Sequence, residues 1–333
     1  MTIKQFEKFL EVRGLKKYFE AGRPTLFSRE KSLIHAVDGV DLNLRRSEII
    51  ALVGESGCGK STLGLLLMGL ESPTDGKVIF EDRDITHLND DQRKDLRRKI
   101  QMVFQDPYES LNPTQTIEQI LTEPLLVHHI GEHDQERSER VIKAMEDAGL
   151  KPADVYLQRY PHELSGGQRQ RVVIAAALVL EPEIIIADEP VSMLDVSIRA
   201  EVINLLADLR IKREIAVIFI THDLGSVGFF ADRVAVMYLG RIVEIGAMLE
   251  VLEKPQHPYT KALLSVIPAP NPRLRHERII LQGDPPNPIN IPSGCRFHPR
   301  CPAAFDMCKL SDPPMMTLTK SHKAACLLIS SGK

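Results

Sequence analysis

The stretch at residues 49–62 constrains the fold more than any other, because it joins a strand, a glycine-rich turn and a helix. The apolar run 49–53 predicts a buried strand, and the helix-forming residues 63–70 predict a helix. Between them stands G-x-x-x-x-G-K-[ST], in which glycines let successive N–H groups face phosphate oxygens. The helix N-terminus attracts the same anion. The pattern therefore predicts a nucleotide-binding phosphate loop, whose members are Gly54, Glu55, Ser56, Gly57, Cys58, Gly59, Lys60, Ser61 and Thr62.

Two side chains of this loop have predicted contacts with the nucleotide. Lys60 is expected to reach the β- and γ-phosphates, and the Ser61 hydroxyl is expected to bind Mg²⁺. Cys58 is expected to be a small packing residue. A turn that only joins strand to helix would leave the Gly-Lys-Ser triplet unexplained.

A second strand, Ile184-Ile185-Ile186-Ala187, ends in two carboxylates, Asp188 and Glu189. Asp188 is placed to hold the Mg²⁺ shell, and Glu189 to orient and deprotonate an attacking water. Strands often end at acidic residues, so this pair of carboxylates alone is weak evidence for a catalytic site. Together with the phosphate loop it becomes strong evidence.

The stretch Leu164-Ser165-Gly166-Gly167-Gln168 predicts a second anion site, because Ser-Gly-Gly at a helix start exposes N–H groups and a hydroxyl. The alternative is a Ser-capped helix with flexible glycines. Two phosphate sites with one phosphate loop indicate two nucleotides, or one nucleotide shared between two chains.

Together these motifs resemble those of the ATP-binding cassette (ABC) transporter ATPases, over residues 9 to about 250. The resemblance implies a P-loop NTPase core of the RecA-like type and a head-to-tail dimer with two ATPs between the subunits. Each phosphate loop would face the partner's Leu-Ser-Gly-Gly-Gln stretch. The matching residues, in chain order, are Gly54–Thr62, Gln105, Leu164–Gln168, Asp188–Glu189, Asp195 and His222.

Further roles follow from this resemblance. Phe19 matches the aromatic that stacks on adenine, with Tyr18 as the alternative and core packing as the other reading of either ring. Gln105 matches the residue that touches Mg²⁺ and water, in a loop that contacts the membrane subunits. Asp195 matches the loop that communicates across the dimer, and His222 the histidine that contacts the γ-phosphate.

A narrower resemblance is to the oligopeptide/dipeptide importer branch, and to the second of its two paired ATPases. It rests on residues 20–36, 104–113, 189–195, 257–260 and 294–301. It implies a second ATPase subunit, identical or different, two transmembrane permease subunits and an extracytoplasmic solute-binding protein. Some relatives carry nickel or oligosaccharides, so those substrates stay open. The expected function is ATP hydrolysis coupled to peptide import.

Composition agrees with a peripheral subunit. The net charge of −3 gives no support for nucleic-acid binding through phosphate attraction. No apolar stretch approaches the roughly 18 residues of a membrane span, and the N-terminus lacks the apolar core of a signal peptide. We expect the chain on the cytoplasmic face of the cell membrane.

Strands alternate with helices along most of the chain, which predicts an α/β fold with a mostly parallel sheet covered on both faces. Helical periodicity between residues 113 and 165 predicts a helical insertion. Prolines multiply after about residue 253, and regular periodicity fades. The expected division is a nucleotide-binding domain, 1–252, and a Pro- and Cys-rich C-terminal extension, 253–333.

Four of the five cysteines crowd this extension, at Cys295, Cys301, Cys308 and Cys326. In a reducing cytosol such a cluster favours metal binding over disulfides. The spacing matches neither zinc ribbons nor ferredoxins, but some members of the resembling branch carry a [4Fe–4S] cluster here. A [4Fe–4S] cluster is the expectation, with Zn²⁺ or free thiols as alternatives.

Two functions of other classes compete with import. A soluble ABC ATPase of nucleic-acid repair or translation would keep the ATP motifs, although such proteins usually have tandem cassettes, coiled-coil insertions or basic surfaces. A redox-sensing regulatory ATPase would place the function in the cysteines.

Overall fold

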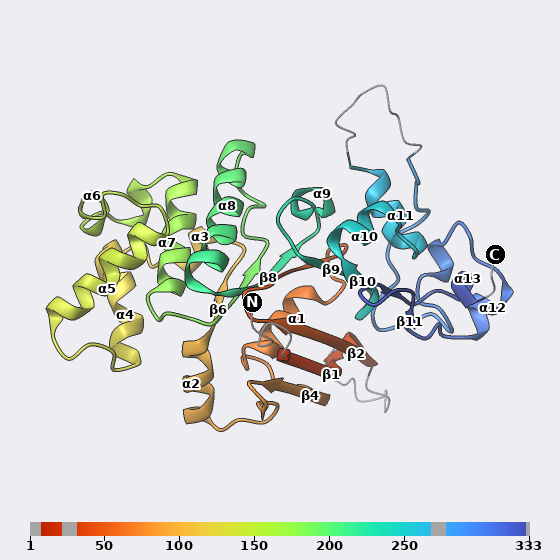
Figure 1. Cartoon of the computed structure of the whole chain (residues 1–333). Coiled ribbons are helices and arrows are strands. Elements are labelled where there is room, and N and C mark those ends of the chain that lie inside the picture. The colour runs from red at the N-terminus through yellow and green to blue at the C-terminus, as the bar shows by residue number, and fades with distance from the viewer. Residues whose placement is uncertain (1–7, 22–31, 268–277, 331–333) are drawn as a thin grey trace.

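The computed structural model describes residues 8–21, 32–267 and 278–330. It forms a central sheet, with a helical part at one end and the C-terminal region at the other (Figure 1). Among the helices of the described residues, none combines the length and apolar composition that crossing a membrane requires.

The central sheet has eight strands in the described part of the chain, in the order β11-β12-β10-β9-β3-β8-β7-β6. From β9 to β6 all neighbours are parallel, whereas β10, β12 and β11 are antiparallel to theirs. The prediction of a mostly parallel sheet is therefore confirmed for its centre. The strands are β3 (Ile49–Val53), β6 (Ile100–Val103), β7 (Ile184–Asp188), β8 (Ala216–Thr221), β9 (Arg233–Tyr238), β10 (Arg241–Ala247), β11 (Met316–Thr317) and β12 (Lys323–Ala324).

Strand β3 shows why its sequence is continuously apolar. Ile49, Ala51 and Val53 pack into the cluster beneath the helices. Ile50 and Leu52 pack into a second cluster on the opposite face. A strand covered on both faces has no polar side, so the usual alternation disappears.

A separate antiparallel sheet, which the sequence pattern did not predict, covers the second face. Its order is β2-β1-β4-β5, and its apolar residues share a cluster with helices α1 and α2. These elements are β1 (Lys8–Ala21), β2 (Ser32–Arg45), β4 (Asp75–Phe80), β5 (Arg83–Asp84), α1 (Lys60–Leu67) and α2 (Asp90–Lys99).

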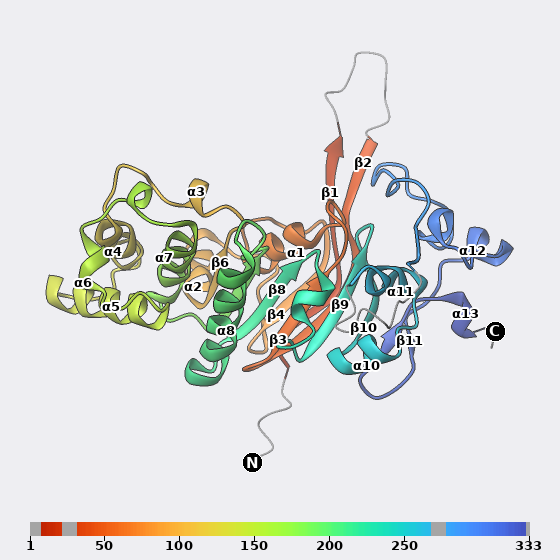
Figure 2. The ribbon, with the colours of Figure 1, turned by 90° about the horizontal axis from the view of Figure 1, so that it is seen from above.

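The segment between β6 and β7 is helical, as its periodicity predicts, and both views place it at one end of the molecule (Figures 1 and 2). Ile117, Leu121 and Leu125 share its buried face. Its elements are α3 (Pro107–Ser110), α4 (Ile117–Val127), α5 (Asp134–Asp147), α6 (Asp154–Leu157), the 3-10 turn η2 (Pro161–Glu163) and α7 (Gly166–Leu178). Helices α8 (Val196–Arg213) and α9 (Leu224–Val227) follow β7 and β8.

The C-terminal region packs on the central sheet through aromatic rings. Phe297 lies 5.2 Å from Tyr238 of β9 and 5.4 Å from Tyr259, between ring centroids. Strands β11 and β12 extend the sheet beside β10. The sequence predicted none of the short elements here, which are α10 (Met248–Glu253), α11 (Pro258–Ser265), η3 (His298–Arg300), α12 (Asp306–Leu310) and α13 (Leu327–Ser330).

Candidate nucleotide-binding site

The predicted phosphate loop runs from β3 into α1, and two of its glycines cannot be replaced without strain. Gly59 has a φ of 105°, and a Cβ there would lie 2.0 Å from the carbonyl oxygen of Ala36. A Cβ on Gly54 would lie 2.2 Å from the carbonyl oxygen of Met237. The loop therefore approaches neighbouring backbone more closely than any side chain allows.

Lys60 is buried within this loop. Its Nζ donates to the carbonyl oxygens of Gly54 (2.7 Å) and Glu55 (3.0 Å). Cys58 is also buried, as expected of a packing residue, and burial raises the pKa of its thiol. The lysine ammonium thus lies inside the curl of the loop, where a phosphate would meet it.

Asp188 and Ser61 lie side by side in positions that fit Mg²⁺. Burial raises the pKa of Asp188, and a hydrogen bond with the Ser61 side chain opposes the shift. Oδ1 of Asp188 is buried and has no hydrogen-bond partner among the described residues. A buried carboxylate oxygen without a partner is costly, and a cation bound by hard oxygen ligands would satisfy it.

The carboxylate of Glu189 is shared by two residues that lie far apart in the sequence. Gln105 donates from Nε2 to Oε2 of Glu189 at 3.5 Å. His222 places Nδ1 3.2 Å from the same oxygen. Glu189 itself has a φ of 45°, an uncommon backbone conformation for a residue with a side chain. Three residues predicted to be catalytic, Gln105, Glu189 and His222, therefore lie together directly after the end of β7 at Asp188.

The second predicted anion site begins helix α7. Ser165 caps the helix: its Oγ accepts the Gln168 N–H at 3.3 Å, and the Gln168 side chain accepts the Ser165 N–H at 3.0 Å. Asp195 caps α8 in the same way, accepting the Ile198 N–H at 3.1 Å. Within the described part of the chain, no hydrogen bond or ion pair joins residues 165–168 to the phosphate loop.

The two candidate adenine-stacking rings are adjacent on β1 and have different surroundings. Tyr18 donates its hydroxyl to Asp38 at 2.5 Å and packs 4.3 Å from the ring of His35. Phe19 has Lys17 Nζ over its ring at 4.7 Å. Because successive strand residues point to opposite faces, only one of the two rings can face a nucleotide.

The four C-terminal cysteines lie within electrostatic range of one another. Burial raises the pKa of Cys295 to about 11, and charges on Cys308, Cys326 and Cys301 would raise it further. Backbone N–H groups donate to three of the sulfurs, those of Cys295, Cys301 and Cys326. Among the described residues, however, no three His, Cys, Asp or Glu side chains converge on a point that one metal ion could occupy.

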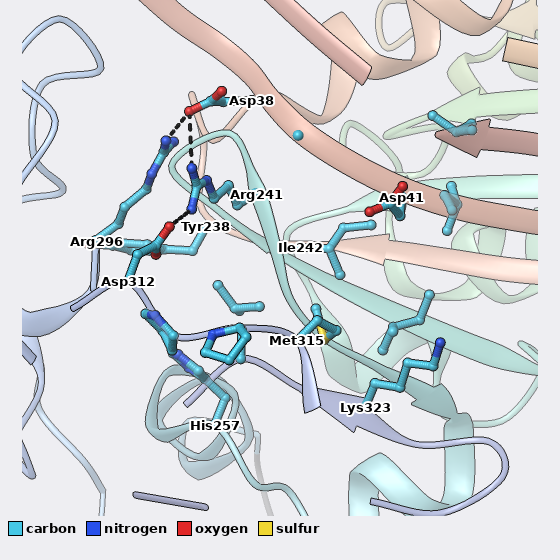
Figure 3. Close-up of a pocket in the computed structure, with 18 of the residues that line it drawn as sticks. Asp38, Asp41, Tyr238, Arg241, Ile242, His257, Arg296, Asp312, Met315 and Lys323 are labelled. Atoms are coloured by element: carbon cyan, nitrogen blue, oxygen red, sulfur yellow. Dashed lines mark hydrogen bonds and ion pairs between the residues drawn. The ribbon is translucent and has the colours of Figure 1, made fainter. Parts of the chain in front are cut away.

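A cavity of about 780 Å³ opens elsewhere, between the antiparallel sheet, β10 and the C-terminal region (Figure 3). Several of the charged side chains that line the cavity are paired with one another. Asp38 accepts a hydrogen bond from Arg296 and lies 3.5 Å from Arg241. Arg241 also forms an ion pair with Asp312. The cavity holds none of the phosphate-loop residues. It is therefore distinct from the predicted ATP site.

The C-terminal region also touches the phosphate loop directly, a contact that the sequence did not indicate. Arg300 donates from both terminal nitrogens to the carboxylate of Glu55, at 2.7 and 3.1 Å. The Tyr259 hydroxyl accepts the Glu55 N–H at 2.8 Å. Arginine and glutamate are 245 positions apart, and no local pattern marks such a pair.

Comparisons with known proteins agree with these motifs. The family model described as "ABC transporter" matches residues 37–192. The model described as "Oligopeptide/dipeptide transporter, C-terminal region" matches residues 243–308.

The relatives extend over the whole chain. The oligopeptide transport ATP-binding protein AppF of Bacillus subtilis is 47% identical and covers 99% of this chain and 100% of its own length. The dipeptide transport ATP-binding protein DppF of Haemophilus influenzae is 48% identical, covering 98% of each.

Two solved structures share the cassette. The post-hydrolysis dimer of the ATP-binding cassette MJ0796 with ADP and Pi has a TM-score of 0.63 at 30% identity, covering 72% of this chain and 98% of its own. Clostridium perfringens cbiO1, part of the transporter complex cbiONQ, has a TM-score of 0.64 at 30% identity, covering 74% and 91%.

Proposed function

We propose the function of this chain from its family: it belongs to the ABC transporter ATPases, in their oligopeptide/dipeptide branch. Members of this family hydrolyse ATP and couple the reaction to transport. The proposed function is the energy-coupling ATPase of a peptide importer. The observation that carries it is the convergence of Gln105 and His222 on the Glu189 carboxylate, beside Asp188 and the phosphate loop.

The geometry supports a direct hydrolysis of ATP. Glu189 accepts a proton from water as the water oxygen attacks the γ-phosphorus, and the bond to the β-phosphate oxygen of ADP breaks. Gln105 and His222 hold the glutamate carboxylate toward that water. Lys60 neutralises charge on the transferred group.

Ser61 and Asp188 would hold Mg²⁺, with Gln105 at its edge. The bound cation would neutralise charge on the β- and γ-phosphates. The unpartnered buried oxygen of Asp188 supports this assignment.

The site is half of a larger one. Within the described residues, Ser165, Gly166, Gly167 and Gln168 make no hydrogen bond to their own phosphate loop. We assign them to the nucleotide held by a partner ATPase, identical or different, and Asp195 to communication across that dimer. Two permease subunits would be driven by its closure, with an extracytoplasmic solute-binding protein supplying the substrate. The chain would then sit peripherally on the cytoplasmic face of the membrane.

We assign residues 1–252 to the nucleotide-binding domain, with residues of about 113–165 as its helical subdomain, and 253–333 to the C-terminal extension. The two matched family regions, 37–192 and 243–308, support this division only broadly, because the second begins within β10.

The test is transport by the reconstituted complex. The tagged chain is purified from membranes with its partners, which are identified and reconstituted in liposomes with the solute-binding protein. Uptake of a labelled di- or oligopeptide that depends on ATP, and that Glu189→Gln abolishes, is the expected result. Uptake of nickel or an oligosaccharide instead would replace the peptide assignment, and ATPase stimulation by nucleic acid without permeases would overturn the transport function.

The four C-terminal cysteines are proposed to hold a [4Fe–4S] cluster. Four thiols in mutual range, with N–H donors to three of them, suit a cluster bound by four cysteines. A single Zn²⁺ with Zn–S bonds of about 2.3 Å would need them to converge on one point, which the geometry does not support. Anaerobic purification with iron, sulfide and visible-absorption measurements tests this. A colourless, zinc-containing preparation would overturn it, and ATPase activity that follows cluster oxidation would favour a regulatory role.

A further inference from the structure

Glu55, the residue that follows Gly54 in the phosphate loop, is bound by residues outside the loop. Both terminal nitrogens of Arg300 donate to its carboxylate, at 2.7 and 3.1 Å. Its N–H is donated to the Tyr259 hydroxyl at 2.8 Å. Both the side chain and the backbone of this residue are thus bound by the C-terminal region.

The supporting residues are themselves rigidly packed. Arg300 ends the η3 turn three residues after Phe297, whose ring packs on Tyr238 and Tyr259. The Arg300 side chain is only 7% exposed, and that of Glu55 is 29% exposed. A bidentate, largely buried pair fixes position more tightly than a surface ion pair does.

The pair also removes a charge conflict. Glu55 is a carboxylate in a loop whose task is to bind polyphosphate, and an unpaired carboxylate there would repel the ligand. The Arg300 guanidinium neutralises it, and the same contact raises the pKa of Arg300. Lys60, which donates to the carbonyl oxygens of Gly54 and Glu55, acts on the inner side of the same loop.

We propose that Arg300 and Tyr259 are positioning residues for ATP: Tyr259 fixes the backbone of Glu55 and Arg300 neutralises its carboxylate, so that the C-terminal region sets the shape of the phosphate loop through Tyr259 and its charge through Arg300. The proposal rests on the proposed function, because it concerns the same nucleotide site. Neither residue need touch the nucleotide.

The experiment measures equilibrium binding of a fluorescent ATP analogue with Mg²⁺ to the purified full chain. Arg300→Gln is expected to raise the Kd about tenfold, because it leaves the Glu55 charge uncompensated. The double variant Glu55→Gln/Arg300→Gln removes that charge, so its Kd should return to within about threefold of the wild-type value. A purely structural role for Arg300 would not be rescued by this second change.

The matched control is Arg213→Gln. Arg213 forms a partly buried ion pair with Asp147, with side chains 18% and 34% exposed, away from the loop. Its Kd should equal that of the wild type. If Arg300→Gln melts too low to be measured, Tyr259→Phe carries the test, since it removes one oxygen and should raise the Kd about threefold.

The outcomes separate the two proposals. If wild type and Lys60→Ala bind the analogue equally, the ATP site itself is wrong. If Lys60→Ala loses binding while Arg300→Gln and Tyr259→Phe keep wild-type Kd values, the positioning role is overturned. An unrescued double variant would also contradict it.

Discussion

Nδ1 of His222 lies 3.2 Å from Oε2 of Glu189, although the two residues directly follow different strands. Strands β7 and β8 are parallel neighbours, so their carboxyl ends meet at one edge of the sheet. The histidine therefore holds the carboxylate that follows Asp188.

Glu189→Gln should bind ATP but hydrolyse it at least about 100-fold more slowly, because the amide cannot accept the proton of water. The ATP-loaded chain should accumulate as a closed dimer. Phosphate release and size-exclusion chromatography with ATP measure the two effects. Unaltered turnover would contradict the catalytic assignment of Glu189.

Asp188→Asn should weaken the response to Mg²⁺. The buried carboxylate beside Ser61 would lose its charge, so hydrolysis should fall at least about 100-fold. A Mg²⁺ titration of ATP hydrolysis checks this, with Asp208→Asn as the control, because that carboxylate is exposed on α8 and pairs with Lys212 on the same helix. A wild-type Mg²⁺ dependence in Asp188→Asn would exclude the site.

Phe19→Ala should weaken ATP binding about tenfold if its ring stacks on adenine. Tyr18→Phe should not, because it removes only the hydroxyl that donates to Asp38. Comparing the Kd values for ATP and for inorganic triphosphate isolates the base. If Phe19→Ala weakened both ligands equally, adenine stacking would be rejected.

The free energy of unfolding should fall in acid because of His257. Burial lowers the pKa of His257 to about 3, whereas the unfolded residue titrates near its ordinary value of 6.5. Below about 6.5 the unfolded chain binds a proton that the folded chain refuses, so stability decreases by about 1.4 kcal/mol per pH unit.

His257→Asn tests this, since asparagine can still cap α11 by accepting the Tyr259 N–H but does not titrate. Between pH 7 and 5 the wild type should lose about 2 kcal/mol more than the variant, measured by urea unfolding. Equal losses would show that His257 does not control the acid response.

Phe297→Ala should destabilise the protein by about 3–5 kcal/mol, because it empties the space that the ring fills against Tyr238 and Tyr259. Phe229 is 95% exposed, so Phe229→Ala should stay within about 0.5 kcal/mol of the wild type. Urea unfolding of both variants measures the contrast. A small effect of Phe297→Ala would mean that the C-terminal region does not share the core of the central sheet.

The sequence by itself determined the features of the protein that depend on short-range sequence patterns. The phosphate loop follows from glycines that adopt conformations other residues avoid, and β3 and β7 from apolar runs that are buried on both faces. The α7 cap follows from Ser165 and Gln168 three residues apart. Spacing along the chain specifies these features, since each depends on neighbours within a few residues.

The tertiary structure decided what depends on distant partners. Gln105, Glu189 and His222 meet only because β6, β7 and β8 lie side by side in parallel. The ion pair between Arg300 and Glu55 joins residues 245 positions apart, and no periodicity in the sequence predicts it. A contact of this kind arises from how two folded surfaces pack, so only the folded chain reveals that the C-terminal region reaches the ATP site.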